Sequence, residues 1–100
     1  MLLKLLTEVV GTFVHLAAIL ITDNPIAIGV SLATVFYIGS KVSGAHVNPV
    51  VSLAEYFNNK LDFNTLVGYI LAQSLGAILA LMYRNLYPNE CHTGRNEACD

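Results

Sequence analysis

The residues best able to contact a solute lie in one short stretch, Ser43 to Val51. Gly44 tolerates backbone angles that other residues resist. Pro49 has no amide hydrogen and pushes Asn48 out of the helical region. Asn48 is nevertheless a good N-cap and Pro49 a good first helical residue, so a helix should begin there. Its side-chain oxygen would cap the helix, and its amide hydrogens would then face a solute beside the positive end of the helix dipole.

The residues just before Asn48 would supply the complementary acceptors. We expect Gly44, Ala45, His46 and Val47 to be extended, with their carbonyl groups forming a ladder along a single file. A neutral hydroxylic solute can exchange its water contacts for such donors and acceptors, whereas an ion finds no replacement for its full hydration shell. The stretch therefore predicts a passage for water or small neutral solutes.

Three apolar runs surround this stretch, and each is long enough to cross a membrane. We expect spans at about residues 5–22, 26–42 and 63–87, in a unit of residues 1–87 followed by a polar tail at 88–100. The helix from Asn48 to Phe57 would measure roughly 15 Å, half of a hydrocarbon layer about 30 Å thick. Irregular backbone at membrane depth is tolerated only where it lines a water-filled cavity or is buried in protein. The sequence thus predicts an all-α membrane protein with three transmembrane helices and one re-entrant half-helix, at about 43–58.

The first span carries a carboxylate, Glu8, on the same helical face as Gly11, Thr12 and His15. A carboxylate near mid-span costs about 2.5–3.5 kcal/mol on insertion scales, so it should face the bundle interior. We expect Glu8 to accept hydrogen bonds from the backbone before Asn48. The alternative is a carboxylate near the interface that reaches headgroup water. For His15 we expect an interior histidine with a satisfied hydrogen bond.

The third span contains a regular stripe of small residues. Small residues spaced four apart let helices approach closely in lipid. The stripe consists of Gly68, Ala72, Gly76 and Ala80. Beside it, Gln73 would hydrogen-bond to another helix or to the re-entrant loop.

Composition and motifs exclude several classes of function. Hydrophobic residues make up 55% and charged residues 12%, against about 25% charged in ordinary soluble domains. The net charge is −2 without a basic run, which argues against a nucleic-acid partner. His46 has no second histidine or cysteine at ligand spacing, so no metal is expected. No catalytic constellation appears, so we expect neither an enzyme nor a cofactor. Cys91 and Cys99 lie in the polar tail, and their pairing stays open.

The stretch Ser43–Val50 resembles the first signature loop of the major intrinsic proteins, the aquaporin and glycerol-channel family, whose usual form ends Asn-Pro-Ala. Glu8-x-x-Gly11-Thr12-Phe13 and Ala72-Gln73-Ser74-Leu75-Gly76-Ala77 match the family at the expected distances. The likeness covers roughly residues 5–87 and only the first half of a family member. It implies half of an aquaporin-like right-handed bundle for passive transport, with Glu8 and His46 holding the loop. Because family members are tetramers, it also implies homo-oligomers.

Two residues depart from the family pattern. Val50 replaces the usual alanine after Asn-Pro, and a bulkier residue there would alter how two half-helices meet. Ile28 lies twenty positions before Asn48, where the family carries Phe in tight water pores and Trp in glycerol pores. A smaller aliphatic side chain suggests a wider filter that passes solutes beyond water, such as glycerol.

Three interpretations stay open for the whole chain. It is a truncated amino-terminal half of a channel, a half that dimerises in opposite orientations, or a non-conducting membrane protein that associates with a partner channel. In each case we expect a partner, either a second half or further copies. Lys4, Lys41 and Lys60 would share one side of the membrane, which favours a cytoplasmic N-terminus by the positive-inside rule.

Overall fold

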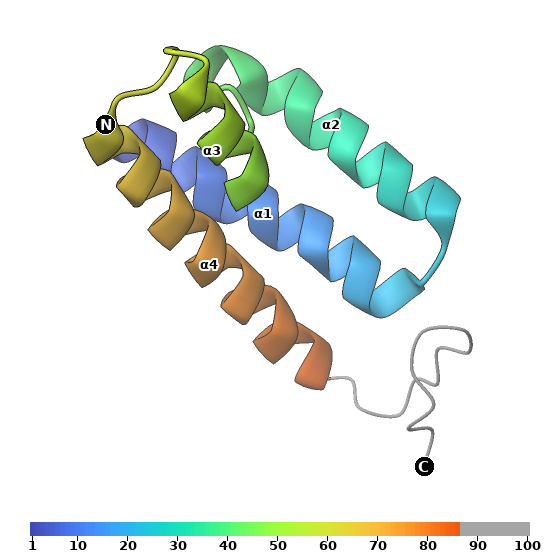
Figure 1. Cartoon of the computed structure of the whole chain (residues 1–100). Coiled ribbons are helices and arrows are strands. Elements are labelled where there is room, and N and C mark those ends of the chain that lie inside the picture. Colours follow the sequence, from blue (N-terminus) through green and yellow to red (C-terminus); the bar gives the residue numbers. More distant parts are fainter. Residues whose placement is uncertain (87–100) are drawn as a thin grey trace.

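The computed structural model describes residues 1–86, and these form four helices (Figure 1). The helices are α1 (Leu2–Thr22), α2 (Pro25–Ser43), α3 (Pro49–Phe57) and α4 (Phe63–Asn85). The expected all-α fold with three long helices and one short helix is confirmed. α1 begins three residues before the expected start of the first span, because leucine and lysine are good helix formers and extend the helix outward. The expected tail at 88–100, with Cys91 and Cys99, lies outside the described residues.

Three of the helices can cross a membrane by length and composition. α1, α2 and α4 contain 21, 19 and 23 residues, and each includes a stretch of 18 residues with a mean hydropathy of 1.9, 1.5 and 1.8, respectively. At about 1.5 Å per residue each spans roughly 30 Å, the thickness of a hydrocarbon layer. The nine residues of α3 cover only about half of that thickness. The chain is therefore an integral, multi-pass membrane protein.

Asparagine caps and prolines begin the two helices that follow the first. The Asn24 side chain accepts hydrogen bonds from the backbone N–H groups of Ile26 and Ala27, and Pro25 is the first residue of α2. Asn48 and Pro49 repeat this arrangement at the start of α3. Proline is favoured at the first helical position because its missing N–H would have no partner there. The expected start of the half-helix at Asn48 is thus a local consequence of capping chemistry.

α1 lies at the centre of the bundle, with α4 along one side, α2 along another, and α3 packed against α4 (Figure 1). α4 approaches α1 through its stripe of small residues. A Cβ added to Gly76 would lie 2.6 Å from the backbone oxygen of Val9, and one added to Gly68 would lie 3.1 Å from Leu5. Ala72 and Ala80 are buried on the same helix. The N-terminus lies at the same end of the bundle as the turn between α3 and α4 (Figure 1).

Candidate functional site

The Glu8 carboxylate is fully buried and accepts four hydrogen bonds at the entrance to α3. Its Oε1 accepts from the backbone N–H of Val47 at 2.8 Å and from Nε2 of Gln73 at 2.9 Å. Its Oε2 accepts from the Ser43 hydroxyl at 2.7 Å and from the backbone N–H of His46 at 3.0 Å. These four donors satisfy the acceptor sites of a carboxylate, so a group that is costly in lipid is fully compensated.

The loop before α3 is not extended, contrary to the expectation from the sequence. Gly44, Ala45 and Val47 have φ values of 88°, 49° and 47°, all in the left-handed region. That region is unfavourable for a β-branched residue such as Val47. The cause is the carboxylate, which draws two successive N–H groups to one side. Backbone with alternating handedness forms such an anion-binding concavity, called a nest.

The nest still separates donors from acceptors, as the extended ladder would have done. A trans peptide unit directs its N–H and C=O in opposite directions. The N–H groups of His46 and Val47 point at Glu8, so the carbonyl groups of Ala45 and His46 point away from it. The N–H of Ala45 likewise points at the Ser43 hydroxyl, 3.1 Å away. One side of the loop is thereby left with unused acceptors.

Two further side chains, neither of which the sequence motif predicts, hold this arrangement from α3 and α4. Ser52 is fully buried, accepts from Nε2 of Gln73 at 2.9 Å, and lies 2.8 Å from Nδ1 of His46. The Tyr69 hydroxyl donates to the carbonyl of Ser43 at 2.6 Å. Its ring meets the His46 ring edge-on, with centroids 5.1 Å apart. The loop is thus held by α1, α3 and α4 together.

Helical spacing was the available signal for both residues. Tyr69 lies four positions before Gln73, so any face that turns Gln73 toward the loop also turns Tyr69 there. Ser52 lies four positions after Asn48 and shares its side of α3. Neither residue belongs to the motif that ends at Val50, so the motif alone does not predict a role for them.

Two hollows flank the loop. The first, of about 580 Å³, is lined by the loop from Gly44 to Asn48, by Leu32 and Phe36 of α2, and by Glu55 of α3. Ala45 and His46, whose carbonyl groups turn away from Glu8, line this hollow, whereas Glu8 does not. The second, of about 320 Å³, is lined by Thr12 and Ala77, among others, and by the start of α3. The following three residues line both hollows: His15, Val47 and Asn48.

Asn48 lines both hollows and brings hydrogen-bond donors to them. Its Oδ1 accepts a hydrogen bond from the backbone N–H of Val50 at 2.8 Å, which caps α3. An amide oxygen that is used in this way leaves the NH₂ group as the outward donor. The amino end of α3 adds roughly half a positive charge at the same place. This end of the loop therefore favours the oxygen of a neutral solute and repels cations.

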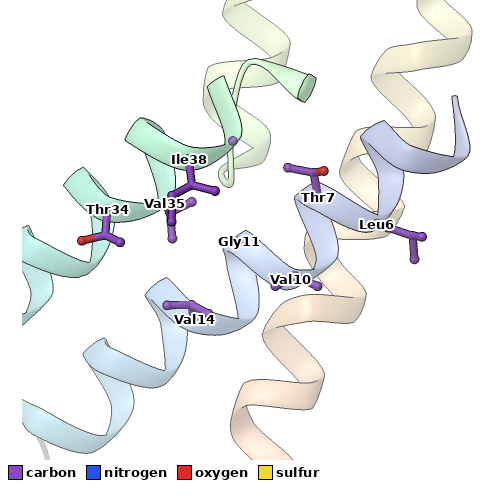
Figure 2. A pocket seen from close by; sticks show the side chains of 9 residues that line it. Leu6, Thr7, Val10, Gly11, Val14, Thr34, Val35 and Ile38 are labelled. Atoms are coloured by element: carbon purple, nitrogen blue, oxygen red, sulfur yellow. The ribbon is translucent and has the colours of Figure 1, made fainter. Parts of the chain in front are cut away.

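A third hollow, between α1 and α2, has no comparable chemistry (Figure 2). It measures about 380 Å³, and aliphatic side chains such as Val10, Val14 and Ile38 line most of it. One of its two threonines, Thr7, donates its hydroxyl hydrogen to the carbonyl of Leu3 within the same helix. The groove is an apolar seam between two helices.

Comparison with known proteins identifies the family. The sequence model of the family described as "Major intrinsic protein" matches residues 2–98, nearly the whole chain. The chain belongs to the major intrinsic protein family. Its members are channels rather than enzymes, which agrees with the expectation of no enzyme.

The curated relatives of this major intrinsic protein include water and glycerol channels by name. The chain is 37% identical over 91 residues to "Aquaporin NIP3-1" of Arabidopsis thaliana, a match covering 77% of this chain and 28% of that protein. It is 34% identical over 86 residues to "Glycerol uptake facilitator protein-like 6" of Lactiplantibacillus plantarum, covering 77% and 40%. It is 39% identical over 64 residues to "Aquaporin-1" of Rattus norvegicus, covering 61% and 24%. No solved structure matches significantly.

The chain therefore spans well under half the length of these relatives. The matches cover 28%, 40% and 24% of the three proteins named. In agreement with the resemblance seen in the sequence, the chain corresponds to part of a major intrinsic protein. Similarity over this part alone does not assign the solutes of the full-length relatives to this chain.

The two departures from the family pattern occupy different places. Val50 is 69% exposed on the first turn of α3. Ile28 is half-buried near the start of α2 and does not line either of the two hollows beside the loop. Its carbonyl accepts the hydroxyl hydrogen of Ser31 at 2.7 Å. Pro49 and Asn48 are exposed, like Val50, so the tip of the half-helix is open on one side.

Proposed function

We propose that this major intrinsic protein forms one wall of a channel that passes water and small neutral hydroxylic solutes, such as glycerol, passively. The observation that supports it best is the division of the loop into two sides. Glu8 takes the N–H groups of His46 and Val47, so the carbonyl groups of the same peptide units are free for solutes. Acceptors in a row at membrane depth suit a file of hydroxyl groups.

The end of α3 supports passage of neutral solutes over ions. Asn48 offers amide hydrogens, and the helix dipole adds roughly half a positive charge. A water molecule or alcohol can donate to the carbonyl row and accept from Asn48 in turn. A cation is repelled at this point, and an anion finds only acceptors along the loop.

For the choice of solute we propose that Ile28 is a selectivity residue, as its position relative to Asn48 implies. Ile28 lies outside the two hollows beside the loop, so its role rests on the resemblance to the family, in which an aromatic ring at this place leaves less room than an aliphatic side chain. The relatives named for water and for glycerol are both compatible with this. We therefore expect glycerol to pass as well as water.

The channel needs a second wall. Irregular backbone exposed to hydrocarbon leaves polar groups unpaired at a cost of several kcal/mol each. In transporters built from inverted repeats the site lies at the interface of the two repeats. We propose that a second half, or a further copy, covers the exposed tip of α3 at Asn48, Pro49 and Val50. We also propose that the N-terminus is cytoplasmic.

Light scattering from proteoliposomes under osmotic shock tests the proposal. The chain alone, inserted in one orientation, should shrink vesicles no faster than lipid does. Addition of the carboxy-terminal half of the glycerol facilitator relative should give a fast component for water and for glycerol. Asn48→Leu should remove it, while the matched change Asn58→Leu, at the exposed end of α3, should not.

The remaining outcomes separate the alternatives. A fast component from the chain alone that Asn48→Leu abolishes would favour a dimer of opposite orientations. No fast component in any combination, despite association of the two halves, would contradict the channel and favour a non-conducting partner protein.

A further inference from the structure

His15 is half-buried in the second half of α1 and lines both hollows beside the loop. Of the three residues that line both hollows, Val47 is apolar, and His15 and Asn48 carry the polar side chains. From the sequence, His15 is expected to be an interior histidine with a satisfied hydrogen bond. In the structure Nδ1 of His15 has a hydrogen-bond partner, and Nε2 has none among the described residues.

The partner of Nδ1 determines the protonation of the neutral ring. Nδ1 of His15 lies 3.0 Å from Oγ of Ser31 on α2. The Ser31 hydroxyl donates its single hydrogen to the carbonyl of Ile28 at 2.7 Å. With that hydrogen on the Ile28 carbonyl, Ser31 can only accept from His15, and we infer the tautomer that has its proton on Nδ1. Nε2 of the neutral imidazole is then an acceptor.

Asn48 supplies the opposite function beside the same two hollows. Its Oδ1 is occupied by the backbone N–H of Val50, so its amide group donates. One side chain that accepts and one that donates match a single hydroxyl group, which does both. A cation would face the positive end of α3, and an apolar solute would leave both groups unpaired.

We propose that His15 is a solute-contacting residue, and that together with Asn48 it binds one neutral hydroxyl group, of water or of an alcohol such as a polyol. The hydroxyl donates its hydrogen to Nε2 of His15, and its oxygen accepts from the Asn48 amide. The proposal builds on the proposed function, because it names a further residue of the same path. Ser31 is a positioning residue, since it holds the ring tautomer from α2.

Nitrogen NMR of the full chain in lipid bilayers tests this without any need for conduction. Val14–His15 is the one Val–His pair in the sequence, so ¹³C-carbonyl valine with ¹³C,¹⁵N-labelled histidine selects the backbone nitrogen of His15, and transfer through its side-chain carbons assigns its ring nitrogens without a substitution. At neutral pH we expect Nδ1 to be protonated and Nε2 to be bare. Magnetisation should pass from water to Nε2, and deuterated water should remove that transfer.

Ser31→Ala provides a variant on the neighbouring helix. With the Nδ1 acceptor gone, the single tautomer should become a mixture, while water contact persists. The inference is overturned if Nε2 carries the proton in the unmodified chain, or if neither ring nitrogen receives magnetisation from water. Because conduction is measured separately, a wet His15 in a chain that never conducts would reject only the proposed function. A dry His15 in a conducting assembly would reject only this inference.

Discussion

Val47 adopts a backbone conformation that β-branched residues avoid, and Glu8 is the group that stabilises it. Residues in such regions cost of the order of 1–3 kcal/mol each and persist only where their surroundings over-determine them. Here the N–H of Val47 is bonded to a buried carboxylate, and its side chain lies 4% exposed against Gly11 and Val35. The strain is thus held in place by one charged residue from a different helix.

Removing the Glu8 carboxylate should therefore disrupt the whole loop. Glu8→Leu leaves two backbone N–H groups, the Ser43 hydroxyl and one amide hydrogen of Gln73 without acceptors, at about 1–3 kcal/mol each. Glu8→Gln keeps one oxygen and should be tolerated better. The fraction of folded chain in detergent, followed through a denaturant titration, measures both.

Glu55→Leu is the matched control for that pair. Glu55 lies on α3 at the rim of the larger hollow and accepts only a long contact from Asn58, at 3.4 Å. Its removal should cost much less than the removal of Glu8. Equal folded fractions for Glu8→Leu and Glu8→Gln would contradict the role given to the carboxylate.

Residue-scale features were predictable where the determining chemistry is local. The start of α3 follows from Asn48 and Pro49, whose capping and lack of an N–H act within one turn. The left-handed backbone at Ala45 and Val47 was not predictable, because intrinsic preference points the other way. It results from hydrogen bonds to Glu8, thirty-nine positions earlier than Val47 in the chain.

At the scale of elements, α1 and α4 are held together by their close backbone approach. Gly76→Ala would place a Cβ 2.6 Å from the carbonyl oxygen of Val9 and 2.9 Å from Cβ of Thr12. Since a backbone atom cannot move aside cheaply, we expect a loss of about 1–3 kcal/mol in unfolding free energy. Denaturant titration in detergent measures it.

Gly29→Ala is the matched control, because nothing lies within 4 Å of a Cβ there. In a helix this change should be neutral or stabilising by up to about 1 kcal/mol. If both alanine variants unfolded alike, the stripe on α4 would not be a close-packed contact.

The N-terminus of α4 has a pH-dependent element outside the membrane. The Thr65 hydroxyl donates to the Asp62 carboxylate, and this hydrogen bond holds the pKa of Asp62 below its usual value. A carboxylate with a lowered pKa stabilises the folded state above its unfolded pKa, and the contribution disappears as the pH falls through the folded value. Asp62→Asn should therefore lower the melting temperature slightly at pH 7. It should make no difference once the pH lies below the pKa of Asp62 in the folded protein.

The control for this prediction is Thr65→Val, which removes the donor and keeps the charge. It should return the pKa of Asp62 toward its usual value. A melting difference between Asp62→Asn and the unmodified chain that is the same at neutral and strongly acidic pH would contradict the assignment.

Elements were predictable from the lengths of the apolar runs, whereas their rotation about the helix axis was not. Three runs long enough to cross a bilayer appear directly in the sequence, and the structure contains three such helices. The pairing of His15 with Ser31 depends on how α1 and α2 are turned toward one another, and both positions look like ordinary span residues. Geometry of this kind depends on packing, which periodicity alone does not specify.

At the scale of the molecule, the chain presents the surface of a membrane protein. Large apolar side chains are exposed along all three long helices, among them Leu6, Ile38 and Leu71. In water such a surface would aggregate, whereas in lipid it needs no cover. The exposed tip of α3 differs, because it combines Val50 with the polar groups of Asn48, and lipid does not suit both.

The arrangement of the long helices makes a topology prediction, namely that α3 enters the membrane and returns to the same side. α2 ends at Ser43 and α4 begins at Phe63, so the nine residues of α3 are the only helix available between them. Nine residues cover about half of the hydrocarbon layer, which is too little to cross it.

Lys41 and Lys60 should therefore lie on one face, which is the cytoplasmic face in the proposed orientation. With Cys91 and Cys99 replaced by serine, Lys41→Cys and Lys60→Cys should both react with an impermeant thiol reagent added to the same side of sealed vesicles. Thr22→Cys, at the far end of α1, should react only from the other side. Labelling of positions 41 and 60 from opposite faces would mean that α3 and its flanking loops cross the bilayer, and the carbonyl row of the proposed channel would then have no place at membrane depth.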